Sequence, residues 1–167
     1  MAKDKISSLH DLFIHELQHL YSGEEQLIEA LPKMVKASSN ANLIKAFQDH
    51  LEETKKQKER LEKAGDILGK DLSGRTCKGM EGLISEGEGI VKADADENVR
   101  DAGLIAAAQK VEHYEIAGYG TASYYAGLLG HNEVADLLNE TLEEEKKADS
   151  KLNSIAVSSV NAKAEKA

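Results

Sequence analysis

The segment most informative about the architecture is residues 104–129, LIAAAQKVEHYEIAGYGTASYYAGLL. Its small and apolar side chains recur at alternating steps of three and four residues, which places them on one face of an α-helix. That face consists of Leu104, Ala108, Val111, Glu115, Gly118, Ala122, Tyr125 and Leu129. Glu115 interrupts the apolar line, and Glu112 lies at its edge. Because a buried carboxylate is costly, this helix predicts a packed core that also contains a polar site.

The rest of the chain repeats this helical periodicity. The long helices are expected at about residues 8–37, 41–68, 99–129 and 132–160. Between the second and the third, residues 69–98 are rich in glycine and have the pattern of only one short helix, at about 80–91. Ser8 is a suitable N-cap for the first helix, and Gly69 is expected to end the second.

The lengths of the connections predict the topology. Short turns make hairpins of the first two and the last two helices, whereas a crossover of about 30 residues joins the hairpins. One long crossover between two antiparallel hairpins is the ferritin-like arrangement. The chain is therefore predicted to be all-α, a single antiparallel ferritin-like four-helix bundle over residues 1–167, with one short extra helix in the crossover.

Charged or polar side chains interrupt the core face of every long helix. The candidate metal ligands among them are Glu24, His50, Glu53, Glu112, Glu115, Glu145 and Asp149. Glu144 lies at the edge of the last helix's core face and is an alternative to Glu145.

The candidate ligands also agree in height along the bundle. Counted from turns centred near residues 38 and 130, Glu24, Glu53, Glu115 and Glu145 each lie about 15 residues away, or roughly 21–23 Å at 1.5 Å per residue. Each hairpin therefore presents facing carboxylates at one level. A solvated helix face is the alternative for any one of these glutamates, but the agreement of four helices in phase and height favours a shared site.

Carboxylates that share a core cannot all stay ionised without a cation. In four-helix bundles of this kind the usual solution is a pair of divalent metal ions, held by glutamates and Glu-x-x-His motifs. Carboxylate ligands with some imidazole suit iron or manganese better than a metal that prefers thiolate. The sequence therefore predicts two iron or manganese ions per chain and no organic cofactor.

Four segments resemble the bacterial YciE/YciF stress-protein family, and the resemblance covers nearly the whole chain. They are Tyr21–Leu27 (YSGEEQL), His50–Thr54 (HLEET), Val111–Ala117 (VEHYEIA) and Glu143–Asp149 (EEEKKAD). The resemblance implies a ferritin-like bundle, a homodimer and a link to stress responses, without a firmly assigned reaction.

A more distant similarity is to the rubrerythrins. Their helices resemble this chain at Gly23-Glu24, at Glu53 and at the Glu112-x-x-Glu115 pattern, which would make the carboxylate ligands Glu24, Glu53, Glu112, Glu115 and Glu145. Two features depart from a standard di-iron site: the second helix has His50-x-x-Glu53, the reverse of the usual order, and the fourth has Glu145 and Asp149 without a histidine. A weaker, different, single or absent metal is therefore an alternative.

The leading hypothesis is a cytoplasmic, ferritin-like stress protein with a dinuclear iron or manganese site that reacts with peroxide or dioxygen. Whether it is an enzyme, and which protein would donate electrons to it, stay open. One alternative is a metal-free dimeric scaffold in which His50, Glu53 and Glu115 form a buried polar network. Another is iron binding without turnover.

Composition excludes several other classes of function. The formal net charge of -9 disfavours nucleic acid and anionic membranes as partners. No stretch approaches the roughly 20 apolar residues that cross a bilayer. Residues 1–8 lack an apolar signal segment, so a cytoplasmic location is expected. Cys77 is the only cysteine, which excludes an intramolecular disulfide, and it is expected to be an incidental loop residue.

The segment His15–His19 (HELQH) matches the zinc-peptidase motif H-E-x-x-H. Both histidines are expected to point away from the core face, so we interpret them as surface or dimer-face residues. His113 lies off the core face and is a candidate for a subunit interface. Tyr21 and Tyr119 lie near Glu24 and Glu115, where either could hydrogen-bond a ligand or simply pack at the boundary.

Overall fold

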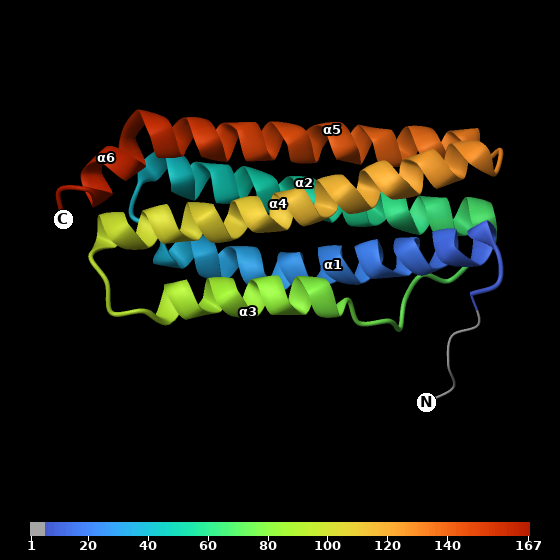
Figure 1. Cartoon of the computed structure of the whole chain (residues 1–167), viewed down its shortest axis with the longest axis horizontal. Coiled ribbons are helices and arrows are strands. Elements are labelled where there is room, and N and C mark those ends of the chain that lie inside the picture. Colours follow the sequence, from blue (N-terminus) through green and yellow to red (C-terminus); the bar gives the residue numbers. More distant parts are fainter. Residues whose placement is uncertain (1–5) are drawn as a thin grey trace.

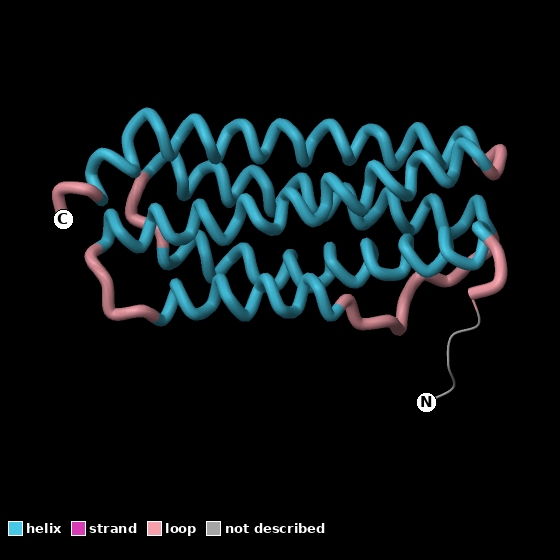
Figure 2. Tube along the Cα trace, in the orientation of Figure 1, coloured by secondary structure: helices cyan, strands magenta, loops and turns pink. Residues whose placement is uncertain are grey.

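The computed structural model describes residues 6–167, and every regular element in that part is helical (Figures 1 and 2). The elements are α1 (Leu9–Ala37), α2 (Ala41–Leu68), α3 (Lys78–Lys92), α4 (Glu97–Leu128), α5 (Asn132–Ile155), the π-helical turn η1 (Ala156–Val160) and α6 (Asn161–Ala164). The predicted all-α bundle is confirmed. Residues 1–5 lie outside this range. They belong to the predicted domain of residues 1–167 and to the N-terminal segment in which no signal peptide was expected.

The first two long helices begin and end where their sequence signals are. The Ser8 hydroxyl accepts a hydrogen bond from the Asp11 backbone N–H at 3.0 Å, which caps α1. Asn40 caps α2 through the N–H groups of Asn42 and Leu43. Gly69 ends α2 with a φ of 63°, a left-handed conformation that glycine adopts at little cost.

Three other boundaries differ from the sequence expectation. α4 begins two residues earlier than residue 99, because Asp96 caps it by accepting from the Asn98 N–H at 2.8 Å. α3 extends beyond the expected residues 80–91 at both ends. Helical structure continues past residue 160, where the last helix was expected to end, and forms α6, because Val160 is buried and α6 packs against α4.

The four long helices form a closed ring. α1 packs against α2 and α4, and α5 packs against α4 and α2. Figure 1 shows that ring neighbours run in opposite directions, since the crossover carries the chain back along the bundle before α4 begins. α3 lies outside the ring and covers α1 and α4. This is the predicted ferritin-like order of two hairpins and one long crossover.

One buried carboxylate joins the two hairpins at an end of the bundle. Asp101 of α4 is 2% exposed and accepts hydrogen bonds from the backbone N–H groups of Ser39 (2.9 Å) and Asn40 (2.8 Å). The Ser39 hydroxyl donates a third, at 2.6 Å. The turn between α1 and α2 is thereby held against the start of α4.

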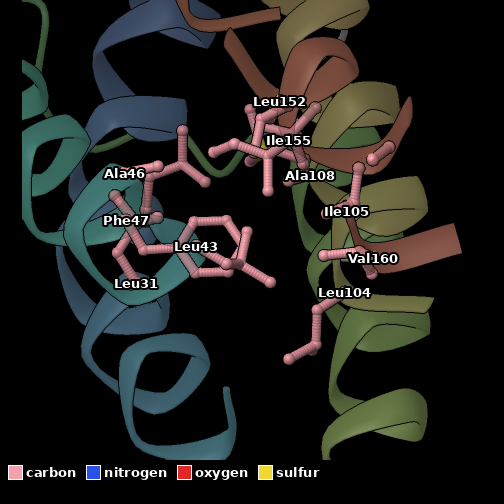
Figure 3. Close-up of a cluster of buried hydrophobic side chains, with 14 of the residues drawn as sticks. Leu31, Leu43, Ala46, Phe47, Leu104, Ile105, Ala108, Leu152, Ile155 and Val160 are labelled. Carbon is pink, nitrogen blue, oxygen red and sulfur yellow. The ribbon is translucent and has the colours of Figure 1, made fainter. Parts of the chain in front are cut away.

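Apolar side chains fill the ring in two separate clusters. The first includes Leu31, Leu43, Phe47, Leu104 and Leu152, and the second includes Phe13, Leu17, Leu61, Ala122 and Leu138. In Figure 3, side chains of α1 and α2 in the first cluster face those of α4 and α5. The layer between the two clusters is polar, and it contains the candidate site. No helix within residues 6–167 combines the length and the apolar character needed to cross a bilayer.

Candidate metal centre

The polar layer draws buried side chains from all four helices of the ring. Its members are Glu24 of α1, His50 and Gln57 of α2, Glu112 and Glu115 of α4, and Glu145 of α5. His50 is 6% exposed, and each of the others is at most 1% exposed. Glutamate is almost never so deeply buried without a partner, so the layer calls for a compensating group.

Four of these side chains converge on one point. His50, Glu112, Glu115 and Glu145 each offer a nitrogen or oxygen atom, and these atoms all lie within 4.8 Å of one another. His50 Nε2 lies 3.3 Å from Glu112 Oε1. One imidazole and three carboxylates converging in this way could hold a divalent metal ion.

Glu24 lies beside this group on α1. Tyr119 of α4 donates a hydrogen bond to its Oε1, while its Oε2 has no partner. Tyr119 itself is fully buried. Of the two tyrosines considered from the sequence, Tyr119 therefore contacts a candidate ligand. Tyr21 instead donates to Glu62 at 3.1 Å.

Gln57 is a member of the layer that was not among the predicted site residues. Its Nε2 donates a hydrogen bond to Glu145 Oε1 and another to Glu144 Oε2, the second at 3.1 Å. A signal was present, because Gln57 falls on the core face of α2 between Thr54 and Leu61, where an apolar residue is expected.

The structure separates Glu144 from Glu145. Glu145 is fully buried in the layer. Glu144 accepts two hydrogen bonds of 2.7 Å from the Arg60 guanidinium, which lowers its pKa even though burial alone would raise it. A carboxylate neutralised by arginine is a poor metal ligand, so Glu145 is the ligand candidate on α5.

Two residues predicted as ligands lie outside the converging group. The Glu53 side chain is 45% exposed, and its Oε2 lies 3.9 Å from Nδ1 of His50, the nitrogen opposite the one that faces Glu112. Asp149 accepts a 3.1 Å hydrogen bond from Gln109 Nε2. Its other oxygen lies 3.4 Å from Nε2 of the exposed His113. The height of Glu53 matches the layer and Asp149 lies about one helical turn beyond Glu145, but both side chains lie at the rim of the bundle.

Most of the unpartnered buried polar atoms belong to this one layer. Within residues 6–167, ten buried side-chain nitrogen or oxygen atoms have no hydrogen-bond partner, and eight of them belong to Glu24, His50, Gln57, Glu112, Glu115 and Glu145. Buried polar atoms are nearly always paired, because each unpaired one costs about 1–3 kcal/mol. Atoms left without a partner in one converging cluster are what an absent cation would satisfy.

The electrostatics of the layer favour the same conclusion. Burial raises the pKa of Glu24, Glu112 and Glu115 well above the usual range for glutamate. Neighbouring carboxyls raise these pKa values further, since each disfavours a second negative charge nearby. These raised pKa values favour the protonated carboxyls in the absence of a cation, and a metal ion would have to displace the protons.

The remaining candidates lie elsewhere. The rings of His15 and His19 are 4.5 Å apart on α1, and neither histidine joins a group of three or more potential ligands within the described residues. Cys77 is not an incidental loop residue: it is fully buried, caps α3, and its Sγ lies 3.0 Å from the Tyr114 hydroxyl. Its role is structural.

The sequence and the fold of this chain are similar to those of known proteins. Residues 8–165 match the family described as domain of unknown function DUF892. Protein YciF of Escherichia coli (strain K12) is 48% identical over 161 residues, which cover 96% of this chain and 97% of YciF. The crystal structure of the E. coli stress protein YciF has a TM-score of 0.90 and 47% identity, and the match covers 93% of this chain and 99% of that one.

Two further solved structures are similar. YcfI from Rhodopseudomonas palustris has a TM-score of 0.88 and 43% identity, with coverage of 93% of this chain and 99% of YcfI. A protein from Xanthomonas campestris pv. campestris has a TM-score of 0.75 over 95% of this chain and 98% of its own. At 21% identity, the likeness to the latter concerns the fold alone.

Proposed function

The chain belongs to the DUF892 family, and we propose, from its similarity to the stress protein YciF and from its polar layer, that it is a stress-response protein with a dinuclear iron or manganese site. The site would react with peroxide or dioxygen. The proposal includes the homodimeric state that the family resemblance implies and the cytoplasmic location expected from the sequence.

The observation that carries the proposal is the set of eight unpartnered buried atoms in one polar layer. Glu24, Glu112, Glu115 and Glu145 bring four carboxylates into the layer, and two divalent cations would balance four negative charges. A single divalent ion would leave two of the four carboxyls protonated or unpaired. The charge count therefore favours two ions per chain.

The residues divide naturally between two ions. His50, Glu112, Glu115 and Glu145 would hold the first, since their ligand atoms converge. Glu24 would complete the second with carboxyls of the same layer. When bound, redox-active iron or manganese would supply the electron transfer that reaction with dioxygen or peroxide requires.

Other residues of this chain would orient the ligands. Tyr119 donates to one oxygen of Glu24, which directs the second oxygen into the layer. Gln57 does the same for Glu145. Glu53 lies behind His50 and would stabilise the proton on Nδ1 when Nε2 binds metal, as carboxylates near ligand histidines do. The proposed ligand set therefore leaves out Glu53 and Asp149.

The metal-free scaffold is less well supported. A polar network that specifies helix register is stabilising only when its members are paired, and a partly paired network is worse than an apolar core. Without a cation Glu115 can be paired by sharing a proton with Glu145, but both nitrogens of His50 still lack a hydrogen-bond partner. The layer is thus poorly suited to serve as structure alone.

Metal content tests the proposal directly. Protein purified without chelator, or reconstituted with Fe²⁺ or Mn²⁺, should contain close to two ions per chain by elemental analysis. The Glu24→Gln/Glu115→Gln double variant should lose most of this metal, because amides of the same shape are weak ligands for these ions. Glu52→Gln is the matched control: it is an equally conservative change on α2, at an exposed carboxylate that pairs with Lys55, and should keep the metal.

The outcomes separate the alternatives. Absence of metal after reconstitution, or equal metal in the double variant, would refute the dinuclear site. Two ions per chain without consumption of peroxide or dioxygen would support iron binding without turnover instead.

A further inference from the structure

A small cavity reaches the polar layer between α2 and α5. His50 and Glu112 form its inner wall, and Ala46 of α2 and Ala148 of α5 lie on opposite sides. The side chain of Glu53 is 45% exposed and Lys147 is exposed, so both belong to the mouth of the cavity. The cavity thus runs from the surface to two of the proposed ligands.

This is also the edge at which the layer comes nearest to solvent. His50 is 6% exposed, whereas Glu24, Glu115 and Glu145 are at most 1% exposed. The apolar clusters close the layer at both ends of the bundle. A reactant that approaches the buried carboxylates meets His50 first.

The volume of the cavity limits what can enter. It measures about 70 Å³. An apolar cavity of about 150 Å³ binds benzene, which has six heavy atoms, so a cavity about half that size suits molecules of two or three heavy atoms. Sites for drug-sized organic molecules measure about 300–1,000 Å³.

The walls favour uncharged reactants. Ala46, Phe47, Ala148 and Leu152 give the cavity an apolar lining. At the mouth, Glu53 is accompanied by two lysines, Lys147 and Lys151, and Lys151 donates to Asp49 at 2.9 Å, so charges of both signs are present there. Desolvating an ion in such a passage is costly, whereas a neutral molecule enters without that penalty.

Resting on the proposed function, we infer that this cavity is the reactant entrance and that it restricts the site to neutral molecules of two or three heavy atoms, such as dioxygen and hydrogen peroxide. Organic hydroperoxides and organic substrates are excluded by size. Ala46 and Ala148 are then the residues that set this limit, because any larger side chain at either position fills the passage.

The first test measures size selection in the unaltered, metal-loaded protein. Hydrogen peroxide should be consumed at least about tenfold faster than cumene hydroperoxide, because the bulky reagent needs a conformational opening. Comparable rates would overturn the inference. This test needs no variant and does not depend on how a substitution folds.

The second test uses binding rather than turnover. Nitric oxide, a neutral diatomic molecule, should bind the Fe²⁺-loaded protein with an absorbance change that stopped-flow records. Ala148→Leu should slow this association about tenfold or more while metal content stays at the unaltered level. Ser150→Leu is the control, since Ser150 is exposed on the same helix and does not line the cavity.

Two results distinguish a wrong entrance from a wrong metal site. Full metal content in Ala148→Leu with an unchanged rate of nitric oxide binding would refute the entrance and leave the dinuclear site intact. Absence of metal in the unaltered protein would refute the proposed function and this inference with it.

Discussion

At the scale of single residues, three glutamates of the polar layer lie in surroundings that disfavour the ionised carboxylate. Glu24, Glu112 and Glu115 are buried between two apolar clusters, and burial is the largest cause that raises the pKa of each. The energetic cost is tolerable because the side chains hold protons until a cation replaces them. A buried aspartate elsewhere, Asp101, differs because its oxygens accept three hydrogen bonds.

The sign of the pH dependence follows from these raised pKa values. Below the unfolded-state pKa of about 4.5, these three carboxyls are protonated in the folded and in the unfolded protein. Folding then does not require any of them to keep a proton that the unfolded chain has lost. As pH rises through the raised folded pKa values, the unfolded chain has already released its protons, so the metal-free fold loses stability. Each carboxyl that stays protonated lowers the free energy of unfolding by up to about 1.4 kcal/mol per pH unit.

We therefore expect the chelator-treated protein to be less stable at pH 8 than at pH 5 in urea unfolding. Glu115→Gln should reduce this slope and raise the stability of the metal-free protein at pH 8 by about 1–3 kcal/mol, because the amide has no charge to bury. A metal-free protein whose stability is flat over this range would contradict the prediction. Half-buried Glu88, whose pKa is lowered to about 2 by hydrogen bonds from Lys33 and Lys92, changes stability only at more acidic pH, below this window.

At the scale of helices, the phase of α2 decides which of its polar residues belong to the site. His50, Thr54 and Gln57 follow steps of four and three residues and are all buried. Glu53 stands one residue before Thr54, about 100° around the helix, which leaves its side chain 45% exposed. The same rule separates Glu145 from its neighbour Glu144 on α5. The height of a residue along its helix therefore does not identify a ligand unless the residue also faces the core.

The hairpins also depend on contacts between helices, and Asp101 provides a test. Asp101→Ala should remove three hydrogen bonds and leave the backbone N–H groups of Ser39 and Asn40 without their partner. We expect the free energy of unfolding to fall by about 2–3 kcal/mol, measured by urea denaturation.

Asp94→Ala is the matched control for this measurement. Asp94 is exposed and lies near the start of the same helix, so its replacement should change stability by less than about 0.5 kcal/mol. Equal effects of the two substitutions would show that the Asp101 contacts do not stabilise the junction.

At the scale of the whole molecule, the polar layer draws on every helix of the ring. Metal held there would connect α1, α2, α4 and α5, the four elements whose packing defines the fold. Binding would therefore be coupled to folding, because the unfolded chain has no such site.

Saturation with Fe²⁺ or Mn²⁺ under anaerobic conditions should raise the free energy of unfolding by about 2.7 kcal/mol for each site at a free metal concentration of about 100 times its dissociation constant. Thermal unfolding measured with and without chelator checks this. The Glu24→Gln/Glu115→Gln variant should show no such shift, and an equal shift in that variant would place the stabilising metal elsewhere.

The sequence by itself determined the fold class, the two hairpins and the long crossover, because helical periodicity, caps and loop lengths are local properties of the chain. It also indicated carboxylates from all four helices at one level, since rise per residue is constant along a helix.

Tertiary structure decided which polar residues meet. Gln57 joins the layer and Glu53 does not, because the rotation of α2 against α5 and α4 sets which side chains face inward. Arg60 donates hydrogen bonds to Glu144, and Tyr119 donates one to Glu24. In each pair the two residues are more than 80 positions apart in the chain. The passage between Ala46 and Ala148 likewise exists only where two helices pack, so no local pattern in the sequence could reveal it.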